Sequence, residues 1–548
     1  MSDSEVSLAG GESTLPSSVP SPELLKLTLA ELTEENKEKA VEIKAEANKA
    51  FVAHEFKRAA DLYTQALDHN PFDATLWCNR AYARIKLEEH GYAHNDASML
   101  LKSNALSMVH LTRRAQCHLQ MLKPQLAIGD FKKVLAIEPH NKSIKQQLEA
   151  TQKLVRRIEF EKAIEREEEM SAALRCLEII ADGGCELDKT YTGPQLPKDA
   201  TTGKYTITLE FIREMMKLFK DGKALPKRYV WEITLGAYSV FEKEPSLVEL
   251  ILESGRSVDV IGDVHGQYFD VLKLFQLTGE PTETHPLLMN GDLVDRGSWS
   301  VEVILTAFAF KWLYPTGMYV NRGNHETKDM NRTYGFEGEA KHKHGEQTYK
   351  LFAHVFTAMP LATLISATKP PVLSPRDKTV IIGPDGTRRY FVVHGGLFSK
   401  DGVTLDDIKK IERIGQQPGQ EGLMCKRTRI LIDLLWTDPQ DAPGRGPSRR
   451  GVGISFGPDV TKRWCTENKV SAIIRSHEVR QDGYTIEHDG LCITVFSAPN
   501  YVDQSGNLGA FIRIDDAGTM EFIKFDKQWH PPLKPMHYAQ GGLASMLM

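Results

Sequence analysis

The chain has 548 residues, of which 41% are hydrophobic and 26% are charged. That composition is typical of globular proteins, and the length favours two or three domains. The 68 basic and 73 acidic side chains leave a formal net charge of −5, which gives no reason to expect nucleic-acid binding. The sequence has no run of 18 apolar residues, so we expect no membrane span.

The first residues and the cysteines indicate the compartment. The opening MSDSEVSLAGG lacks the basic and apolar stretches of a secretory signal, so we do not expect secretion. The seven cysteines are scattered and form no CxxC pair, which argues against a disulfide framework or a cysteine-based zinc site. We therefore expect the protein in the cytoplasm, with or without a nuclear pool. We also expect it to be a monomer.

The N-terminal part combines a tail with a repeat. Residues 1–35 are rich in Ser, Pro, Glu and Gly and are predicted to be disordered. Residues 36–142 repeat every 34 positions, with alanines in two registers: Ala47, Ala81 and Ala115, then Ala59, Ala93 and Ala127. This period predicts an all-α tetratricopeptide-repeat (TPR) solenoid of three repeats. A generic helical bundle is the alternative, but six coinciding alanines disfavour it.

The sequence pattern changes after the repeats. Residues 143–180 are charged and predict a connecting helix, and residues 181–204 are rich in Gly, Pro and charge, as linkers are. Residues 205–534 predict an α/β domain, because short β-branched runs alternate with helical segments. The runs are VDVIG, PLLMNG, GMYVN, RRYFVVHGG, VSAIIRS and LCITVFS.

Each of these runs ends in polar residues suited to binding metals. They are Asp263 and His265, Asp292 and Asp295, Asn324 and His325, His394, His477, and the SAPNY segment with Tyr501. Buried strands deliver functional groups at their carboxyl ends, where short loops bring them together. Turn residues are the alternative, but turns favour Asn, Asp, Gly and Ser and not repeated His.

The candidate ligands are oxygen and nitrogen donors without a thiolate. Such a set suits Mn²⁺, Fe or Zn²⁺. With two or three ligands for each ion and one shared carboxylate, it fits a pair of divalent metal ions roughly 3.5–4 Å apart. Such a pair lowers the pKa of a bridging water and stabilises negative charge on a phosphoryl group.

The motifs GDVHGQ, GDLVDRG, RGNHE, HGG and SAPNY, in this order, resemble the PPP family of metal-dependent serine/threonine protein phosphatases. GDxH and GNHE alone would indicate only the wider calcineurin-like phosphoesterases, and DRG and SAPNY narrow the resemblance. It implies an α/β calcineurin-like metallophosphatase domain, a central β-sandwich flanked by helices. It also implies hydrolysis of phosphoserine and phosphothreonine monoesters in phosphoprotein substrates, by two-metal activation of a bridging water.

The resemblance assigns the ligands residue by residue. Asp263 and His265 would bind the first metal and Asp292 would bridge the two ions. Asn324, His394 and His477 would bind the second metal. Any one of these histidines alone could equally be a core residue, and the constellation favours the ligand assignment.

The family pattern also implies roles in catalysis. His325 would protonate the leaving oxygen, oriented by Asp295, since a carboxylate raises an imidazole pKa. Arg296 and Arg450 would bind the substrate phosphate, and Tyr501 would line the cleft. RGPSRRG offers three arginines, so the choice of Arg450 rests on the GVGISFG that follows. Asp438, in the WTD segment, could either support a site residue or be only a turn residue, so it has no assigned role.

TPR grooves often bind C-terminal peptides through a two-carboxylate clamp. The clamp positions correspond to Lys44, Asn48, Asn79, Val109 and Arg113. The groove is therefore expected to bind the C-terminal tail of heat-shock protein 90, although Val109 replaces a lysine and the loss of one charged contact costs about 1–3 kcal/mol. Lys86 is an additional basic candidate. Alternatively, these are ordinary solvated helix residues.

The resemblance further implies autoinhibition, in which the TPR domain covers the active site with help from the C-terminus. Glu88 matches an acidic residue that points toward the catalytic arginines, and residues 535–548 would form an autoinhibitory segment ending in the apolar GGLASMLM. We therefore expect that deletion of residues 1–175 raises basal activity.

Several positions depart from the family pattern. Val502 follows SAPNY where Cys is usual, and Asn321 stands where an apolar residue is typical. Residues 366–389 and the basic segment 426–432 look inserted, and the sequence assigns neither a role.

Two other functions remain open from the sequence. A calcineurin-like diesterase or nuclease would not need two phosphate-binding arginines. A TPR co-chaperone with an inactive phosphatase fold would not need a complete ligand set.

Overall fold

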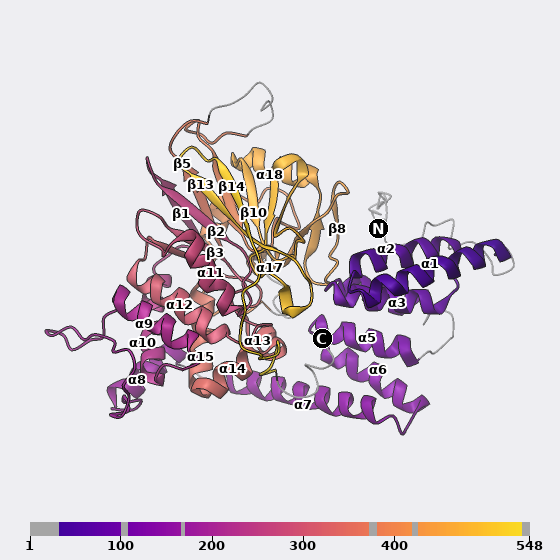
Figure 1. The fold of residues 1–548 in the computed structure, drawn as a ribbon, viewed down its shortest axis with the longest axis horizontal. Helices are drawn as coiled ribbons and strands as arrows, with labels where there is room; N and C mark the ends of the chain where they lie inside the picture. The colour runs from indigo at the N-terminus through magenta and orange to yellow at the C-terminus, as the bar shows by residue number, and fades with distance from the viewer. Residues whose placement is uncertain (1–31, 100–107, 166–169, 372–380, 419–425, 540–548) are drawn as a thin grey trace, which may run out of the picture. The chain divides into compact units, whose positions relative to one another are not determined.

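The computed structural model describes residues 32–99, 108–165, 170–371, 381–418 and 426–539 (Figure 1). The chain divides into two units, Met1–Cys117 and His118–Met548. No helix within these described ranges is long and apolar enough to cross a membrane. The described cysteines are all free thiols. Residues 1–31 of the predicted tail and the terminal GGLASMLM lie outside the described residues, whereas Glu34 and Glu35, which the prediction placed in the tail, begin helix α1.

The first unit consists of paired helices. They are α1 (Glu34–Val52), α2 (Phe56–His69), α3 (Ala74–Lys86), α4 (His90–Met99) and the start of α5 (Met108–Gln120). Helices α1 and α3 begin at residues whose side chains accept backbone N–H groups: Thr33 from Asn36 (3.3 Å) and Asp73 from Thr75 (2.8 Å). These caps satisfy N–H groups that the first helical turn leaves without partners.

The repeat alanines form the helix-crossing points. All six alanines of the two registers, including Ala115 and Ala127 of the third repeat, have 0% exposure. A side chain of this size lets neighbouring helices approach closely, which explains why alanine recurs every 34 residues. The predicted TPR fold is confirmed.

The second unit contains the remaining helices. They are α6 (Pro124–Ile137), α7 (Lys142–Glu165), α8 (Ala172–Ala181), α9 (Leu209–Lys220), α10 (Lys227–Phe241), α11 (Tyr268–Thr278), α12 (Ser300–Leu313), α13 (Lys328–Tyr334), α14 (Phe336–His344), α15 (Glu346–Ala358), α16 (Leu405–Lys409), α17 (Lys426–Trp436) and α18 (Pro458–Asn468). Several of them pack on a sheet sandwich (Figure 1).

The described part of this unit forms a six-stranded sheet of order β1-β5-β6-β10-β12-β11 and a five-stranded sheet of order β14-β13-β2-β3-β4. The bounds of the first sheet are β1 (Leu247–Leu252), β5 (Ala362–Ala367), β6 (Arg389–Val393), β10 (Ala472–Arg475), β11 (Tyr484–Glu487) and β12 (Cys492–Val495). Those of the second are β2 (Ser257–Ile261), β3 (Leu287–Asn290), β4 (Met318–Asn321), β13 (Gly509–Asp515) and β14 (Met520–Phe525).

Apolar side chains from both sheets meet in one core that includes Val260, Leu288, Ile474 and Ile493. Helices α9–α12, α14 and α15 cover the outer face of the five-stranded sheet, and α16–α18 cover that of the six-stranded sheet. The predicted β-sandwich flanked by helices is therefore confirmed.

The segments that look inserted have structural roles. Residues 366–389 connect β5 to β6, which pair antiparallel with Ser366 opposite Arg389; residues 372–380 lie outside the described part. Residues 426–432 form the first half of α17, and Ile430, Leu431 and Ile432 are buried in the outer core of the six-stranded sheet. Burial of these apolar side chains explains the second segment as part of the core.

Candidate metal centre

The two sheets bring the polar strand ends to one edge. Strands β2, β3 and β4 run parallel in one sheet, and β6, β10 and β12 run parallel in the other. The sheets join at this edge, because Asp263, just past β2, pairs with Phe496, just past β12. The carboxyl ends of all six strands thus converge, as the sequence pattern predicted.

Glycines allow the loops at this edge to approach closely. A Cβ on Gly262 would lie 2.2 Å from the Val495 carbonyl oxygen, and one on Gly323 would lie 2.2 Å from Asp292 Oδ1. Five site residues also have positive φ angles: His265, Asp292, Asp295, Arg296 and His477. Backbone strain of this kind concentrates at functional sites, where the surrounding structure holds it.

Asp292 lies between two groups of potential ligands. On one side, His265 Nε2 is 3.5 Å from Asp292 Oδ2 and 3.8 Å from Asp263 Oδ2. On the other side, His394 Nε2 is 3.3 Å from Asp292 Oδ2, and His477 belongs to the same cluster. All these side chains are buried. The position of Asp292 suits a carboxylate shared by two ions.

The hydrogen-bond chemistry of this cluster fits a divalent cation. His394 Nδ1 lies 2.9 Å from the Asn290 carbonyl oxygen, and His265 Nδ1 lies 3.0 Å from that of Val294. A neutral imidazole that donates from Nδ1 has a lone pair on Nε2, and such hydrogen bonds are typical of metal-binding histidines.

Several potential ligand atoms gather around His394 Nε2. It lies 2.9 Å from Asn324 Oδ1 and 3.2 Å from His477 Nδ1. The Asn324 oxygen faces only acceptors, including the Asp292 carboxylate. A cation among these atoms would turn each repulsive contact into a bond, so the residues fit the metal that the family implies.

Burial dominates the electrostatics of the carboxylates. It raises the pKa of Asp263 to about 7, and the neighbouring Asp292 adds to the effect. Burial likewise raises the pKa of Glu326 to about 7. Positive charge at the centre would hold these groups ionised.

His325 and Asp295 lie together as predicted. His325 Nδ1 is 2.9 Å from Asp295 Oδ2, and the His325 backbone N–H donates to Asp292 Oδ1 (2.9 Å). Asp295 also accepts from the Phe336 N–H (2.9 Å) and Asn331 Nδ2 (3.2 Å). Burial raises the pKa of Asp295 to about 7, against these hydrogen bonds. The carboxylate of Asp295 therefore holds the His325 ring at Nδ1.

The predicted phosphate arginines are held by different partners. The Arg296 guanidinium lies 4.0 Å from the centre of the Tyr334 ring. Arg450 Nε donates to Asp438 Oδ2 (2.9 Å), and its Nη2 donates to the carbonyl of His477. The other arginines of that loop turn elsewhere, since Arg445 pairs with Asp401 and Arg449 with Glu478.

Tyr501 lies beside the candidate metal ligands. Its ring centre lies 5.1 Å from that of His265 and 5.3 Å from that of Phe496. Val502, in place of the usual Cys, packs against the same small apolar cluster. Asn321 is fully buried, donates to Asn290 Oδ1 (2.9 Å) and accepts from Thr363 (2.8 Å). This polar link between the sheets explains its departure from an apolar residue.

The sequence assigned no role to two supporting residues, Glu326 and Asp438. Glu326 accepts the N–H groups of Asp292, Leu293 and Gly323 at 2.8–2.9 Å, and so fixes two ligand loops at once. Asp438 pairs with both Arg450 and the buried Arg475. Only the position of Glu326 directly after RGNH hinted at such a role. Asp438 carries no local signal.

The predicted TPR clamp residues lie on α1, α3 and α5. Asn48 Oδ1 accepts from Asn79 Nδ2 (3.3 Å) and from the Tyr63 hydroxyl (2.7 Å). Lys44 pairs with Asp73 (3.0 Å). Val109 is 51% exposed, so a lysine there would be accommodated.

Tyr82 was not predicted and lies between the basic residues. Arg113 is 3.7 Å and Lys86 5.6 Å from its ring centre. Stacking on an aromatic ring fixes a guanidinium for recognition of a carboxylate. Glu88 follows α3 with a φ of 61°, and its role in autoinhibition stays a prediction.

Comparison with known proteins agrees with this geometry. A family model described as calcineurin-like phosphoesterase matches residues 256–481, and one described as PPP5 TPR repeat region matches residues 148–249. Serine/threonine-protein phosphatase T of Aspergillus oryzae is 45% identical over 93% of this chain and 99% of that protein. Human serine/threonine-protein phosphatase 5 is 41% identical over 91% and 93%, respectively.

A solved structure gives the same result for the catalytic part. It is a Saccharomyces cerevisiae protein serine/threonine phosphatase with similarity to human phosphatase PP5, 42% identical, with a TM-score of 0.53, covering 61% of this chain and 100% of that one. Fold and site together define a metal-dependent phosphoesterase of the calcineurin-like class. More narrowly, the chain belongs to the serine/threonine-protein phosphatase 5 family, together with phosphatase T of Aspergillus oryzae and of Schizosaccharomyces pombe.

The chain is therefore a serine/threonine protein phosphatase with a TPR region, and its metallophosphatase domain fits two-metal hydrolysis. The buried ligand clusters around Asp292 support divalent metal ions as its cofactors.

Proposed function

We propose that the centre holds Mn²⁺, Fe or both, with Zn²⁺ as a further possibility, to hydrolyse phosphoserine and phosphothreonine monoesters. Asp263, His265 and Asp292 would hold one ion, and Asp292, Asn324, His394 and His477 the other. The convergence of lone pairs around His394 Nε2 and Asp292 Oδ2 carries this proposal. The absence of thiolates from the donor set favours these ions.

Bound ions would supply an activated bridging water and neutralise charge on the phosphoryl oxygens. The chain's own residues would do the rest. Arg296 and Arg450 would hold the phosphate from two directions, and Tyr501 would close the wall beside it. His325 would give its Nε2 proton to the departing seryl or threonyl oxygen, while Asp295 keeps Nδ1 protonated.

The test is phosphopeptide hydrolysis with Mn²⁺ by the full chain and by Asp292→Asn. The variant removes one charge from the shared position, and kcat should fall by orders of magnitude with reduced metal content. Asp482→Asn is the matched control, because this carboxylate is 69% exposed and pairs with Lys524. Near-normal turnover by Asp292→Asn would refute the assignment. Hydrolysis of bis-p-nitrophenyl phosphate without phosphopeptide turnover would favour a diesterase.

We propose further that the TPR groove docks the C-terminal tail of heat-shock protein 90. The Lys44, Asn48 and Asn79 cluster and the stacking of Arg113 on Tyr82 support a carboxylate clamp. In calorimetry, Arg113→Ala should weaken binding of a tail peptide about tenfold or more. Lys57→Ala, on an exposed face of α2, should leave it unchanged. Equal binding of a C-terminally amidated peptide would contradict the clamp.

Autoinhibition by the TPR region is likewise a proposal for this chain. It rests on the family relationship and on the placement of Glu88 after α3. Deletion of residues 1–175 should raise basal phosphopeptide hydrolysis, and Glu88→Gln should do so in part. Unchanged basal activity in the deletion would rule the proposal out.

A further inference from the structure

A shallow groove lies beside the metal centre. Its lining includes Gln267, Phe269, Asp270, Arg296, Trp299, Val502 and Asp503. Three of these adjoin the catalytic residues: Gln267 follows the His265 loop, Arg296 is a predicted phosphate ligand, and Val502 follows Tyr501. A substrate whose phosphate binds Arg296 would therefore place neighbouring residues at or near this groove.

The C-terminal residues build one wall of the groove and are firmly attached. The Gln528 N–H donates to Asp270 Oδ1 (2.7 Å), and Ser298 Oγ donates to the Lys534 carbonyl (2.8 Å). The Met536 N–H donates to the Arg296 carbonyl (2.8 Å), and the Met536 side chain is buried. These bonds tie the wall directly to the loop that carries Arg296, so the groove is a built feature of the catalytic unit.

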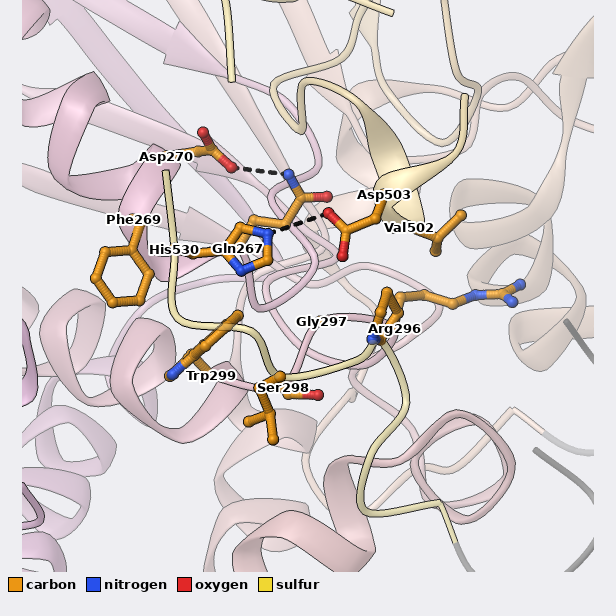
Figure 2. A pocket seen from close by; sticks show the side chains of 12 residues that line it. Gln267, Phe269, Asp270, Arg296, Gly297, Ser298, Trp299, Val502, Asp503 and His530 are labelled. Carbon is orange, nitrogen blue, oxygen red and sulfur yellow. Dashed lines mark hydrogen bonds and ion pairs between the residues drawn. The ribbon is translucent and has the colours of Figure 1, made fainter. Parts of the chain in front are cut away.

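The floor and sides are largely apolar. The Trp299 ring packs edge-on against Phe269 (5.3 Å between ring centres) and against His530 (5.2 Å). Leu533 and Pro535 add aliphatic surface. In Figure 2 the Trp299 side chain lies next to His530, and Asp503 lies on the far side of His530 from Trp299. Such a slot suits a side chain with a long apolar stem.

The groove also carries negative charge opposite Arg296. Asp503 has a 44% exposed side chain, and its ion-pair partner among the described residues is His530, at 3.1 Å. Asp270, buried at the back, adds a second carboxyl group hydrogen-bonded to Gln267 (2.9 Å). Figure 2 shows Arg296 extending away from these acidic residues. The groove is thus cationic at its phosphate end and acidic at its far end.

We propose that this groove binds an arginine or lysine side chain of the substrate, close in sequence to the phosphorylated residue. This inference rests on the proposed phosphatase function and names a substrate class for it. The aliphatic stem packs on Trp299 and Phe269, and the cationic head binds the Asp503 carboxylate at the groove's outer edge. A glutamate or aspartate in the same place meets Asp503 and is disfavoured.

The experiment compares phosphoserine peptides that differ at one position. Arginine, norleucine or glutamate is placed in turn at each of the neighbouring positions on both sides, and kcat/KM is measured with Mn²⁺. At one or two positions arginine should exceed norleucine by about fivefold, the effect of a partly exposed ion pair, and the preference should shrink at high salt. Equal rates for arginine and norleucine everywhere would overturn the proposal.

The variant Asp503→Asn tests the contribution of the Asp503 charge, because it removes the charge and keeps the shape of the side chain. The φ angle at this position is 58°, which asparagine tolerates, so the backbone is not strained by the change. The variant should lose the arginine preference and keep its kcat/KM for the norleucine peptide and for p-nitrophenyl phosphate. If Asp503→Asn still preferred the arginine peptide, the proposed role of Asp503 would be refuted. The control variant Asp482→Asn should keep the preference for arginine. Failure of the phosphatase assignment would look different, because neither phosphopeptide nor p-nitrophenyl phosphate would then be hydrolysed.

Trp299→Leu tests the apolar wall. It shortens the surface against which the stem packs and should raise KM for the arginine peptide more than for a peptide with alanine at that position. Hydrolysis of p-nitrophenyl phosphate reports whether the centre is intact. An equal rise in KM for both peptides would refute the stem-packing part of the proposal.

Discussion

Glu326 links the loop that carries Asp292 to the loop that carries Asn324. Its carboxylate accepts N–H groups from Asp292, Leu293 and Gly323. In Glu326→Gln, an amide NH₂ would face a backbone N–H, so at least one of these bonds should be lost. We expect metal affinity and kcat to fall by about 10–100-fold, the usual effect of removing a group that orients ligands.

Metal titration followed by activity measures that effect. Glu253→Gln is the matched control, since the Glu253 side chain is 66% exposed. If Glu326→Gln bound Mn²⁺ and turned over phosphopeptide like the control, the positioning role would be wrong.

His285, which is not a proposed ligand, offers a pH-dependent contribution to stability. Its Nε2 lies 3.1 Å from Asp259 Oδ2 and its Nδ1 lies 3.0 Å from Ser257 Oγ. The hydrogen bond to Asp259 is the main cause of its raised pKa. A raised folded-state pKa stabilises the protein fully below the unfolded value, near 6.5, and this stabilisation is lost as pH rises through the folded value.

Wild type should therefore exceed His285→Gln in free energy of unfolding at low pH, and this difference should become smaller as pH increases. The free energy of unfolding in urea, measured from about pH 6 to about pH 8 on both proteins, gives this difference. The exposed His140 provides the control His140→Gln, which should show no such trend. A difference that stays constant or widens with pH would contradict the assignment.

At the scale of elements, a buried ion cluster joins α3 to α4. Arg80 binds Asp96 through Nε (3.0 Å) and Nη2 (2.8 Å), and Arg84 Nη1 binds the same carboxylate (2.7 Å). Arg80 is 1% exposed. Asp96→Ala would leave both guanidinium groups buried without their carboxylate, which costs about 3–5 kcal/mol.

Unfolding followed by circular dichroism should show that loss in the TPR helices. Asp61→Ala, which breaks an exposed pair with Lys57 on α2, should change stability by less than about 1 kcal/mol. A similar small effect for Asp96→Ala would mean that the cluster does not stabilise the repeat.

The sequence predicted those elements that carry a local signal. The repeat alanines and the β-branched runs before the metal-binding motifs could be read directly, because burial fixes their residue types. Strand β13 had no such signal. It pairs antiparallel with β2 across more than 200 positions, and only the folded sheet defines that pairing. Tyr82 was missed for the same reason, since its role depends on Arg113 from another helix.

The same limit applied to the segment 426–432. The sequence assigned this basic segment no role, whereas in the structure Ile430, Leu431 and Ile432 pack into the core that α17 shares with the six-stranded sheet. The polar residue Asn321 could not be explained from the sequence, because its hydrogen-bond partners Thr363 and Asn290 lie on other strands.

At the scale of the whole molecule, metal binding should stabilise one unit of the chain. All the proposed ligands lie within His118–Met548, and none lies in Met1–Cys117. A ligand that binds only the folded state at 100 times its Kd adds about 2.7 kcal/mol of stability. In addition, the cation relieves repulsion among acceptor atoms held within 3.3 Å of His394 Nε2.

Removal of metal with a chelator should therefore lower the melting temperature of the catalytic unit by several degrees. Hydrogen exchange should accelerate in the loops 262–266, 291–296 and 323–326, whose backbones carry or adjoin the ligands, and return to the slow rate on addition of Mn²⁺. Exchange in α1–α3 serves as the internal control. It should not change, because these helices belong to the first unit, which contains none of the proposed ligands. Equal acceleration in both units would indicate general destabilisation, and unchanged exchange in the three loops would place the metal elsewhere.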